Sequence, residues 1–227
     1  MTGTLINAGA IVLAGFCGLL LRRKIPENIS NTMEKALGVL IIVLGIQYGI
    51  KAENFAVIGL SLAGGVIIGE WRNWDGRLTG LGKRLQSRFG NGESDFANGF
   101  VSASVLFCVG AMAVVGSLEE GLYGSYQILL VKSLLDAIFS IIFAASMGIG
   151  VIFSAIPVLI YQGSISLLAG LIEPILTEPV LNNMTSLGGI LIAALGLNLA
   201  SAASIRAANL LPGFLLLPVI MAVLSFF

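Results

Sequence analysis

The amino-acid sequence predicts an all-α protein that crosses a membrane about eight times. Of its 227 residues, 57% are hydrophobic and only 11% are charged, and the mean hydropathy is +0.99. Soluble domains carry about 25% charged residues. The apolar residues also form blocks of about 20, the length that a helix needs to cross the hydrocarbon core of a bilayer. The lipid bilayer is therefore the first partner that the composition predicts.

Eight apolar blocks follow one another along the chain. We expect helices in them because only helices and closed barrels satisfy their own backbone hydrogen bonds in lipid, and the blocks are too uniformly apolar for barrel strands. Gly148, Gly150 and Pro157 can break the sixth helix near its start. The expected spans are Thr4 to Leu21, Met33 to Ile50, Phe55 to Gly69, Ala97 to Gly116, Tyr126 to Ser146, Gly150 to Ile172, Thr185 to Ala203 and Leu210 to Phe226.

Basic residues predict the orientation of these spans. If the N-terminus lies outside, ten Lys and Arg residues fall on the cytoplasmic side and only Lys51 falls outside, which is the bias that sets membrane topology. The same orientation places Glu120 in an external connection. The connection 71–96 interleaves Trp and Leu with basic residues, a pattern typical of an amphipathic segment at the membrane surface. The cytoplasmic basic residues are Arg22, Arg23, Lys24, Lys35, Arg72, Arg77, Lys83, Arg84, Arg88 and Arg206.

The composition also disfavours several classes of function. Lys plus Arg and Asp plus Glu are balanced at 12 each, so the chain has no basic footprint for nucleic acid. There is no histidine, the commonest metal ligand among side chains and a frequent general base. Cys17 and Cys108 both lie inside apolar blocks. With no pairing of a nucleophile and a base and no set of metal ligands, we expect no enzyme activity, no metal site and no cofactor.

Two stretches of the chain resemble two others in a way that predicts an inverted repeat. Residues 33–47 align with residues 184–198 at a constant offset of 151 positions and with six identities, and residues 7–15 align with residues 162–170 at an offset of 155. Spans 1 and 6 would cross the membrane in opposite directions. Spans 1–3 and 6–8 would then be related by a pseudo-two-fold axis in the membrane plane, as in many secondary transporters. The alternative is an old duplication that is kept only for packing.

This repeat predicts four parts along the chain. A first three-helix unit occupies residues 1–70, and a cytoplasmic amphipathic segment follows over residues 71–96. A central helix pair lies within residues 97–146, and the inverted second three-helix unit occupies residues 147–227. The central pair would therefore lie between the two related units in sequence.

The fifth span carries two ionisable residues, Lys132 and Asp136. An isolated charge near the centre of a membrane helix costs about 2.5–3.5 kcal/mol, so both side chains should face protein or water rather than lipid. Their spacing of four residues puts them on one helix face. We expect Asp136 to bind a proton or a cation, and Lys132 to tune its affinity or to bind an anion. The structural alternative is an ion pair that only neutralises itself.

Four amide residues extend this polar site along the predicted repeat. Asn7 aligns with Gln162, and Gln47 aligns with Asn198. Inversion would place Asn7 and Gln47 toward the external ends of their spans and their partners toward the cytoplasmic ends. Two groups of amides would then lie on either side of the charged pair and line a polar path. Amides that only bridge helices, at about 0.6 kcal/mol each, are the alternative.

Six segments of the chain are distinctive when taken together. They are GTLINAGAIVLAG, FANGFVSASVLFCVGAMAVVGSLEEGL, KSLLDAIFS, SAIPVLIYQGSISLLAG, GGILIAALGLNL and IRAANLLPGF. They resemble one known family, the YqgA/YdfK-like bacterial inner-membrane proteins, which are catalogued as a domain of unknown function. The resemblance implies a multi-pass protein of the bacterial plasma membrane and implies no substrate. It also supports Asn7, Lys132, Asp136, Gln162 and Asn198 as site residues by motif match. Members often have Pro where this chain has alanine in GAMA, so the resemblance gives no support for a kink at that position.

These observations favour a secondary transporter that moves a small solute or ion by alternating access and that can couple this movement to a proton or a cation. A channel with the same polar path is one alternative, although the sequence has no carbonyl-filter motif. A membrane assembly protein that transports nothing is another, and it would have a dry core. Several short helices make a small bundle, so a homo-oligomer is possible. Substrate, coupling ion and direction of transport stay open.

Overall fold

The structure is a computed structural model that describes residues 1–22, 25–89 and 96–224. Over these residues the chain forms α-helices and short 3-10 helices and no strand, which confirms the predicted all-α class. Seven of the described helices are long and apolar enough to cross a membrane, or eight if one bent pair is counted as a span. Arg23 and Lys24 lie outside the described residues. So do residues 90–95 of the predicted segment 71–96 and residues 225–226 of the last predicted span.

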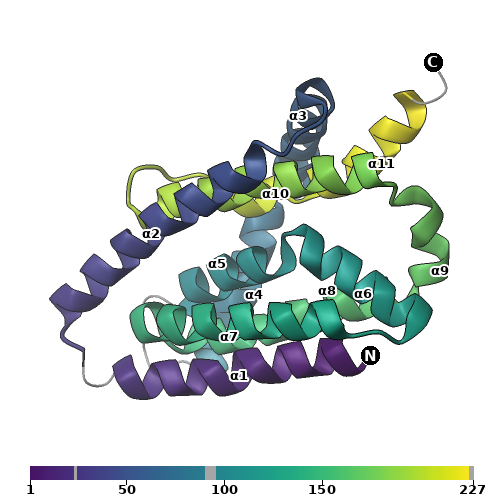
Figure 1. The fold of residues 1–227 in the computed structure, drawn as a ribbon. Helices are drawn as coiled ribbons and strands as arrows, with labels where there is room; N and C mark the ends of the chain where they lie inside the picture. Colours follow the sequence, from purple (N-terminus) through teal and green to yellow (C-terminus); the bar gives the residue numbers. More distant parts are fainter. Residues whose placement is uncertain (23–24, 90–95, 225–227) are drawn as a thin grey trace. The chain divides into compact units, whose positions relative to one another are not determined.

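The helices follow most of the predicted spans, but the fourth predicted span is divided between two helices, α5 and α6, and one helix is added (Figure 1). The segment predicted to lie at the membrane surface contains a helix of its own, α4. The first elements are α1 (Thr2–Arg22), α2 (Glu27–Gly49), α3 (Phe55–Arg72), α4 (Trp74–Phe89), α5 (Phe96–Cys108), α6 (Ala111–Tyr123) and α7 (Gln127–Met147). The others are η1 (Ile149–Ser154), α8 (Ala155–Leu167), α9 (Ala169–Ile172), η2 (Glu173–Ile175), α10 (Glu178–Leu199), η3 (Ala207–Leu210) and α11 (Pro212–Leu224).

The described chain divides into two compact units. Unit 1 comprises Met1–Glu34, Thr79–Cys108 and Met112–Leu171, and unit 2 comprises the remaining segments, Lys35–Leu78, Val109–Ala111 and Ile172–Phe227. Unit 1 therefore contains α1, α5, most of α6, α7, η1 and α8. Unit 2 contains most of α2, together with α3, α10 and α11. The inverted repeat that the sequence predicts is not confirmed by this division.

In unit 1, α1 packs along α7 and α8 (Figure 1). Gly3 lies against Leu129 near the start of α7, and Gly18 lies against Ala144 near its end, so α1 and α7 run parallel. Gly15 lies against Ile152, which precedes α8, and Asn7 contacts a residue further along α8, so α1 and α8 run antiparallel. The small residues allow this close approach of helices.

Parallel packing of α1 and α7 bears on the number of crossings. If α2 and α3 each cross the membrane, α7 can run in the same direction as α1 only when one further crossing lies between α3 and α7. The bent pair α5 and α6, at 60° to each other, is the apolar pair in that interval. The relative directions of the helices in unit 1 therefore favour counting α5 and α6 as one broken span.

Glycine explains two breaks between helices. Gly110, between α5 and α6, has φ +131°, and Gly148, between α7 and η1, has φ +87°, values that L-residues with a side chain rarely adopt. The chain therefore turns at Gly110, with alanine and not proline at position 111. The predicted break at Gly148 is found, whereas Pro157 is the third residue of α8, where its missing N–H group disturbs no helical bond.

In unit 2, two antiparallel helix pairs pack through glycine. In the first pair, Gly38 of α2 lies against Gly196 of α10, and Gly45 lies against Gly189. In the second pair, α3 packs against α11. The start of α3 is capped by Asn54, whose side chain accepts hydrogen bonds from the first backbone N–H groups of the helix.

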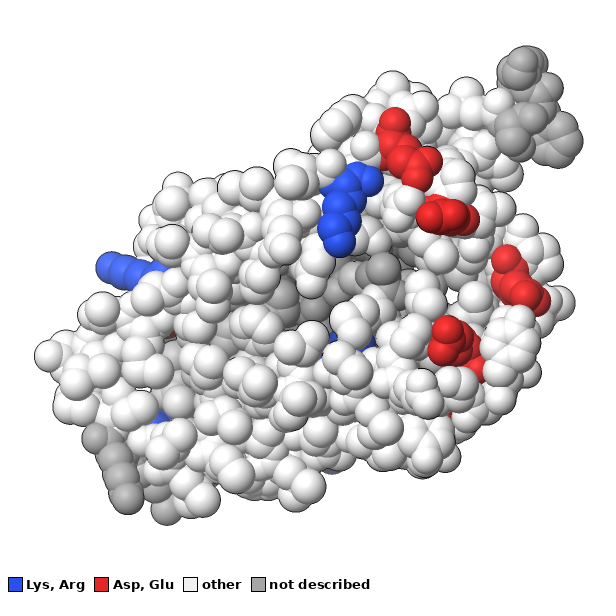
Figure 2. All heavy atoms as spheres, viewed as in Figure 1, with Lys and Arg blue, Asp and Glu red and all other residues white. Residues whose placement is uncertain are grey.

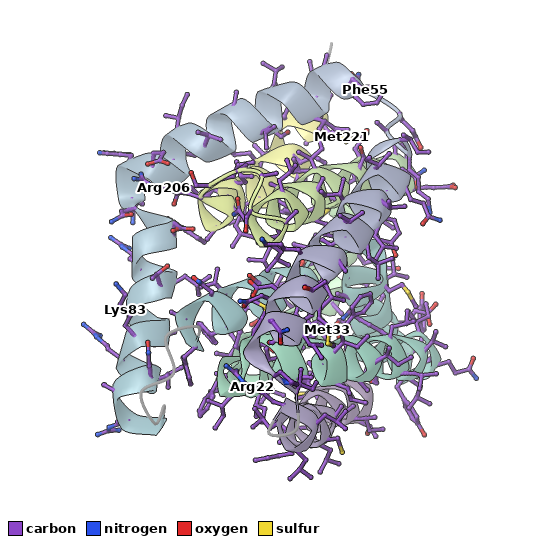
Figure 3. The ribbon with its side chains drawn as sticks, turned by 90° about the vertical axis from the view of Figure 1, so that its left-hand side faces the viewer. Arg22, Met33, Phe55, Lys83, Arg206 and Met221 are labelled. Carbon is purple, nitrogen blue, oxygen red and sulfur yellow. The ribbon has the colours of Figure 1, made fainter. Side chains whose placement is uncertain are left out.

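The surface is consistent with a bilayer environment. Many large apolar side chains of the apolar helices are exposed, and charged side chains are few on the face drawn in Figure 2. α4 differs, because it carries Arg77, Lys83, Arg84 and Arg88 and exposes them. Lys83 projects outward from α4 (Figure 3). An amphipathic basic helix of this kind is suited to the membrane surface, as predicted for segment 71–96.

Candidate functional site

The predicted charged pair lies in the interior of unit 1. Lys132 and Asp136 are one turn apart on α7, and each residue is only 6% exposed. The Lys132 ammonium donates a hydrogen bond to Asp136 Oδ2 and forms an ion pair with it. Both charges are therefore withdrawn from lipid, and each is neutralised by the other.

Two of the predicted amides complete this cluster from neighbouring helices. Asn7 on α1 donates through Nδ2 to Asp136 Oδ2 at 3.0 Å and to Gln162 Oε1 on α8 at 3.3 Å. Asn7 and Gln162 are both 0% exposed. The four residues Lys132, Asp136, Asn7 and Gln162, called the charged cluster below, thus join α1, α7 and α8.

The structure corrects the predicted arrangement of the amides. Asn7 and Gln162 were expected on opposite sides of the charged pair, but they hydrogen-bond to each other beside it. The sixth span runs over Ile149–Leu167, so Gln162 lies in its second half. There it meets the early turn of the antiparallel α1 that carries Asn7.

Two polar atoms of the charged cluster, and one further along α7, have no partner among the described residues. Asn7 Oδ1 and Gln162 Nε2 are buried and unpaired, and so is Ser140 Oγ, one turn beyond Asp136 on α7. Leaving a buried polar atom without a partner costs about 1–3 kcal/mol. Two of these atoms belong to the charged cluster itself, and the third lies one turn further along α7.

The hydrogen bonds of the charged pair are also one-sided. Lys132 and Asn7 both donate to Oδ2 of Asp136, and no donor in the described part of the chain reaches Oδ1. Lys132 has three N–H groups and uses one of them on Asp136. The pair therefore keeps one acceptor atom and two donor groups for further contacts.

A second buried carboxylate, Glu120, was not predicted as part of the site. The sequence placed it in an external connection, but it is only 5% exposed and lies near the end of α6. It accepts hydrogen bonds from Thr4 Oγ1 at 2.7 Å, from the backbone N–H groups of Gly3 and Thr4 and from Ser166 Oγ at 3.3 Å. The available signal was the start of α1, which has N–H groups that need acceptors and attracts negative charge.

Glu120 and the charged cluster are connected through two rows of side chains. Thr4 and Asn7 are one turn apart on α1, and Gln162 and Ser166 are one turn apart on α8. Thr4 and Ser166 contact Glu120, whereas Asn7 and Gln162 contact each other. The first turn of α1 thus donates hydrogen bonds to Glu120, and Asn7 in its second turn donates one to Asp136.

The remaining predicted site residues, Gln47 and Asn198, belong to unit 2. Gln47 is exposed near the end of α2. The Asn198 side chain both donates to the backbone oxygen of Ile205 and accepts from its N–H group, each at 2.7 Å. Asn198 therefore closes the connection between α10 and η3, and the structure gives it a local role in the backbone.

The charged cluster offers charge and amide groups rather than metal ligands. Among the described residues, no three His, Cys, Asp or Glu side chains converge on a point that could hold a metal ion. An ammonium, a carboxylate and two amides can bind a charged or zwitterionic solute, or can exchange protons with water.

Comparison with known proteins identifies relatives along almost the entire chain. The family described as "Protein of unknown function (DUF554)" matches residues 2–222. The uncharacterized membrane protein YdfK of Bacillus subtilis is 31% identical over 231 residues, which cover 100% of this chain and 98% of YdfK. The uncharacterized protein YqgA of Escherichia coli is 32% identical over 219 residues, which cover 94% and 93%. The predicted resemblance is thereby confirmed. No solved structure gives a significant match.

Proposed function

Because this chain belongs to the DUF554 family of unknown function and its described residues form seven helices long and apolar enough to span a membrane, or eight if the bent pair is one span, we propose that it is a secondary transporter. It moves a small solute or ion across the bacterial inner membrane, with its N-terminus outside. Transport proceeds by alternating access around Lys132 and Asp136. Asp136 is the coupling group, and Lys132 sets its affinity.

One observation carries this proposal. Asn7 and Gln162, which the sequence alignment makes equivalent positions of an inverted repeat, hydrogen-bond directly to each other. In a two-fold arrangement, only residues close to the axis can contact their own equivalents. The axis would therefore pass beside Asp136. Inverted-repeat transporters bind their substrates at the interface between the repeats, so the charged cluster has the position expected of a substrate site.

The packing of α2 against α10 in unit 2 supports the same symmetry. Gly38 lies against Gly196 and Ala200. Its equivalent at the offset of 151 is Gly189, which lies against Gly45 and Gly49. Those two glycines are themselves the equivalents of Gly196 and Ala200. This reciprocity, in which i contacts j′ and j contacts i′, is the pattern of an isologous interface, here within one chain.

The unpaired atoms of the charged cluster favour transport over a purely structural role. A membrane assembly protein with a dry core would be expected to satisfy buried polar groups, because each orphan is costly in the absence of water. Among the described residues, Asn7 Oδ1 and Gln162 Nε2 of the charged cluster have no partner, and neither has Ser140 Oγ one turn from Asp136; the other unpaired buried atoms are Ser61 Oγ, Ser117 Oγ and Asn209 Nδ2. The unpaired atoms of the charged cluster would gain partners when the site opens to water or binds a solute.

The proposal is tested by flux into proteoliposomes over a panel of ions and small metabolites. The wild type is compared with Asp136→Asn and with a matched control, Ser133→Ala. Ser133 is also buried on α7, but its hydroxyl donates only to the backbone oxygen of Leu129 within the same helix. We expect saturable uptake of at least one solute that Asp136→Asn abolishes and Ser133→Ala retains.

Two results would argue against the proposal. Uptake that is unchanged in Asp136→Asn would remove this carboxylate from the mechanism. Ion flux that never saturates and reaches channel rates would indicate a channel through the same polar path.

A further inference from the structure

The charge of the site restricts what it can bind. Lys132 and Asp136 form a neutral pair with little exposure to solvent. A ligand with one charge would take one member of the pair and leave the other buried without compensation, which is strongly destabilising. A ligand that carries both charges can replace the internal ion pair and leave no buried charge uncompensated.

The hydrogen-bonding capacity of the site restricts the ligand further. Two acceptor atoms lack donors in the described part of the chain, Asp136 Oδ1 and the buried Asn7 Oδ1. Two donor groups also have capacity left, the Lys132 ammonium and Gln162 Nε2. Acceptors and donors each include one charged group and one amide. The site therefore offers two acceptors to a cationic group and two donors to an anionic group.

We propose that the substrate of the charged cluster is a small zwitterion with an ammonium and a carboxylate close together, as in an α-amino acid. This inference rests on the proposed transport function and adds the class of substrate. The ligand ammonium donates to Asp136 and Asn7. The ligand carboxylate accepts from Lys132 and Gln162.

The nearest other buried carboxylate does not compete for this role. Glu120 contacts Thr4, one turn before Asn7 on α1, and it is already satisfied by Thr4, Ser166 and backbone N–H groups. Its charge is held by the first turn of the helix, where negative charge is favourable. The exchangeable charges of the site are therefore those of Lys132 and Asp136.

The test measures binding directly, without transport. The purified full-length protein in detergent micelles is heated with each common L-α-amino acid, and the shift of its melting temperature is titrated. For each amino acid that stabilises the protein, the deaminated and decarboxylated analogues are titrated in parallel. Propionate and ethylamine are the pair for alanine. We expect stabilisation by at least one amino acid and by neither of its two analogues.

Variants of the charged pair give a second readout that does not depend on losing activity. Asp136→Asn leaves the Lys132 charge free, so this variant should bind the carboxylate analogue that the wild type does not bind. Lys132→Met should instead bind the amine analogue. Each variant should bind the amino acid at least about tenfold more weakly, which corresponds to about 1.4 kcal/mol. Ser133→Ala should behave as the wild type.

The possible results separate this inference from the proposed function. If no amino acid stabilises the protein, or if the wild type binds propionate as well as alanine, the zwitterion is excluded. If propionate binds the wild type only at acid pH, the site takes an anion together with a proton. That result overturns the zwitterion and leaves the proposed transport function standing. If amino acids bind with the expected charge pattern but no flux is found in proteoliposomes, the transport proposal fails while the binding site stands.

Discussion

Replacing Lys132 and Asp136 singly and together tests whether each of the two charges is compensated by the other. In Lys132→Met, Asp136 would keep its hydrogen bond from Asn7 but lose its counter-charge. In Asp136→Asn, Lys132 would be left as a buried ammonium. Breaking a buried pair from one side costs about 3–5 kcal/mol, whereas replacing both partners is often neutral or stabilising. We therefore expect each single variant to lose about 3 kcal/mol and the double variant to lose less than about 1 kcal/mol.

The assay is reversible unfolding in mixed detergent micelles, followed by circular dichroism, for the wild type and the three variants. If the two sites were independent, the double variant would lose the sum of both single effects, about 6 kcal/mol. Near-complete recovery in the double variant is the expected result. An additive loss would contradict the mutual compensation of Lys132 and Asp136, because it would mean that each side chain is satisfied by groups other than its partner.

Three other predictions follow from individual contacts. Asn7→Ala removes the hydrogen bonds of 3.0 and 3.3 Å and should lower the free energy of unfolding by about 1–3 kcal/mol in the same micelle assay; no change would mean that the amide is dispensable. Glu120→Gln should weaken the hold on the start of α1 by about 0.3–1 kcal/mol, seen as faster amide hydrogen exchange confined to its first turn. Gly45→Ala and Gly196→Ala each place a Cβ within 2.5–2.7 Å of the facing backbone and should each cost about 1–3 kcal/mol. Gly49→Ala, with nothing within 4 Å of the added atom, should not destabilise the protein, and equal losses in all three glycine variants would contradict the packing.

The parts of the site that sequence reasoning predicted are those that depend on local geometry. Lys132 and Asp136 meet because residues four apart lie on one face of any helix. Asn7 and Gln162 are in contact although they lie 155 positions apart in the chain. Only the repeat alignment related these two positions. The sequence still placed them on opposite sides of the pair, although Gln162 lies in the second half of the sixth span, Ile149–Leu167.

Glu120 shows where sequence reasoning fails for a physical reason. Its partners, Gly3 and Thr4, are more than 110 positions away in the chain, and no repeat or motif links them. A charged residue near the end of an apolar block is ordinarily exposed at the membrane surface. Its burial follows only from the packing of α6 against the start of α1, which a single sequence does not encode in any short pattern.

The fold was predictable at the level of helices because apolar blocks of span length leave few other structures in lipid. The breaks were partly predictable from glycine. Gly148 was expected to interrupt the chain and does so, whereas the bend at Gly110 was given no support because the neighbouring residue is Ala111. The positive φ of Gly110 shows that glycine alone provides the turn.

Alternating access around Asp136 can be tested directly by measuring whether position 140 is reached from each side of the membrane. Its hydroxyl is buried and unpaired one turn from Asp136, and Ser140→Cys changes its size little. In a background in which Cys17 and Cys108 are replaced by serine, a membrane-impermeant thiol reagent is applied to right-side-out and to inverted vesicles. Alternating access predicts that the cysteine reacts from both sides, and that a condition which increases labelling from one side decreases it from the other. A cysteine that reacts from neither side, or that rises and falls on both sides together, would contradict the account.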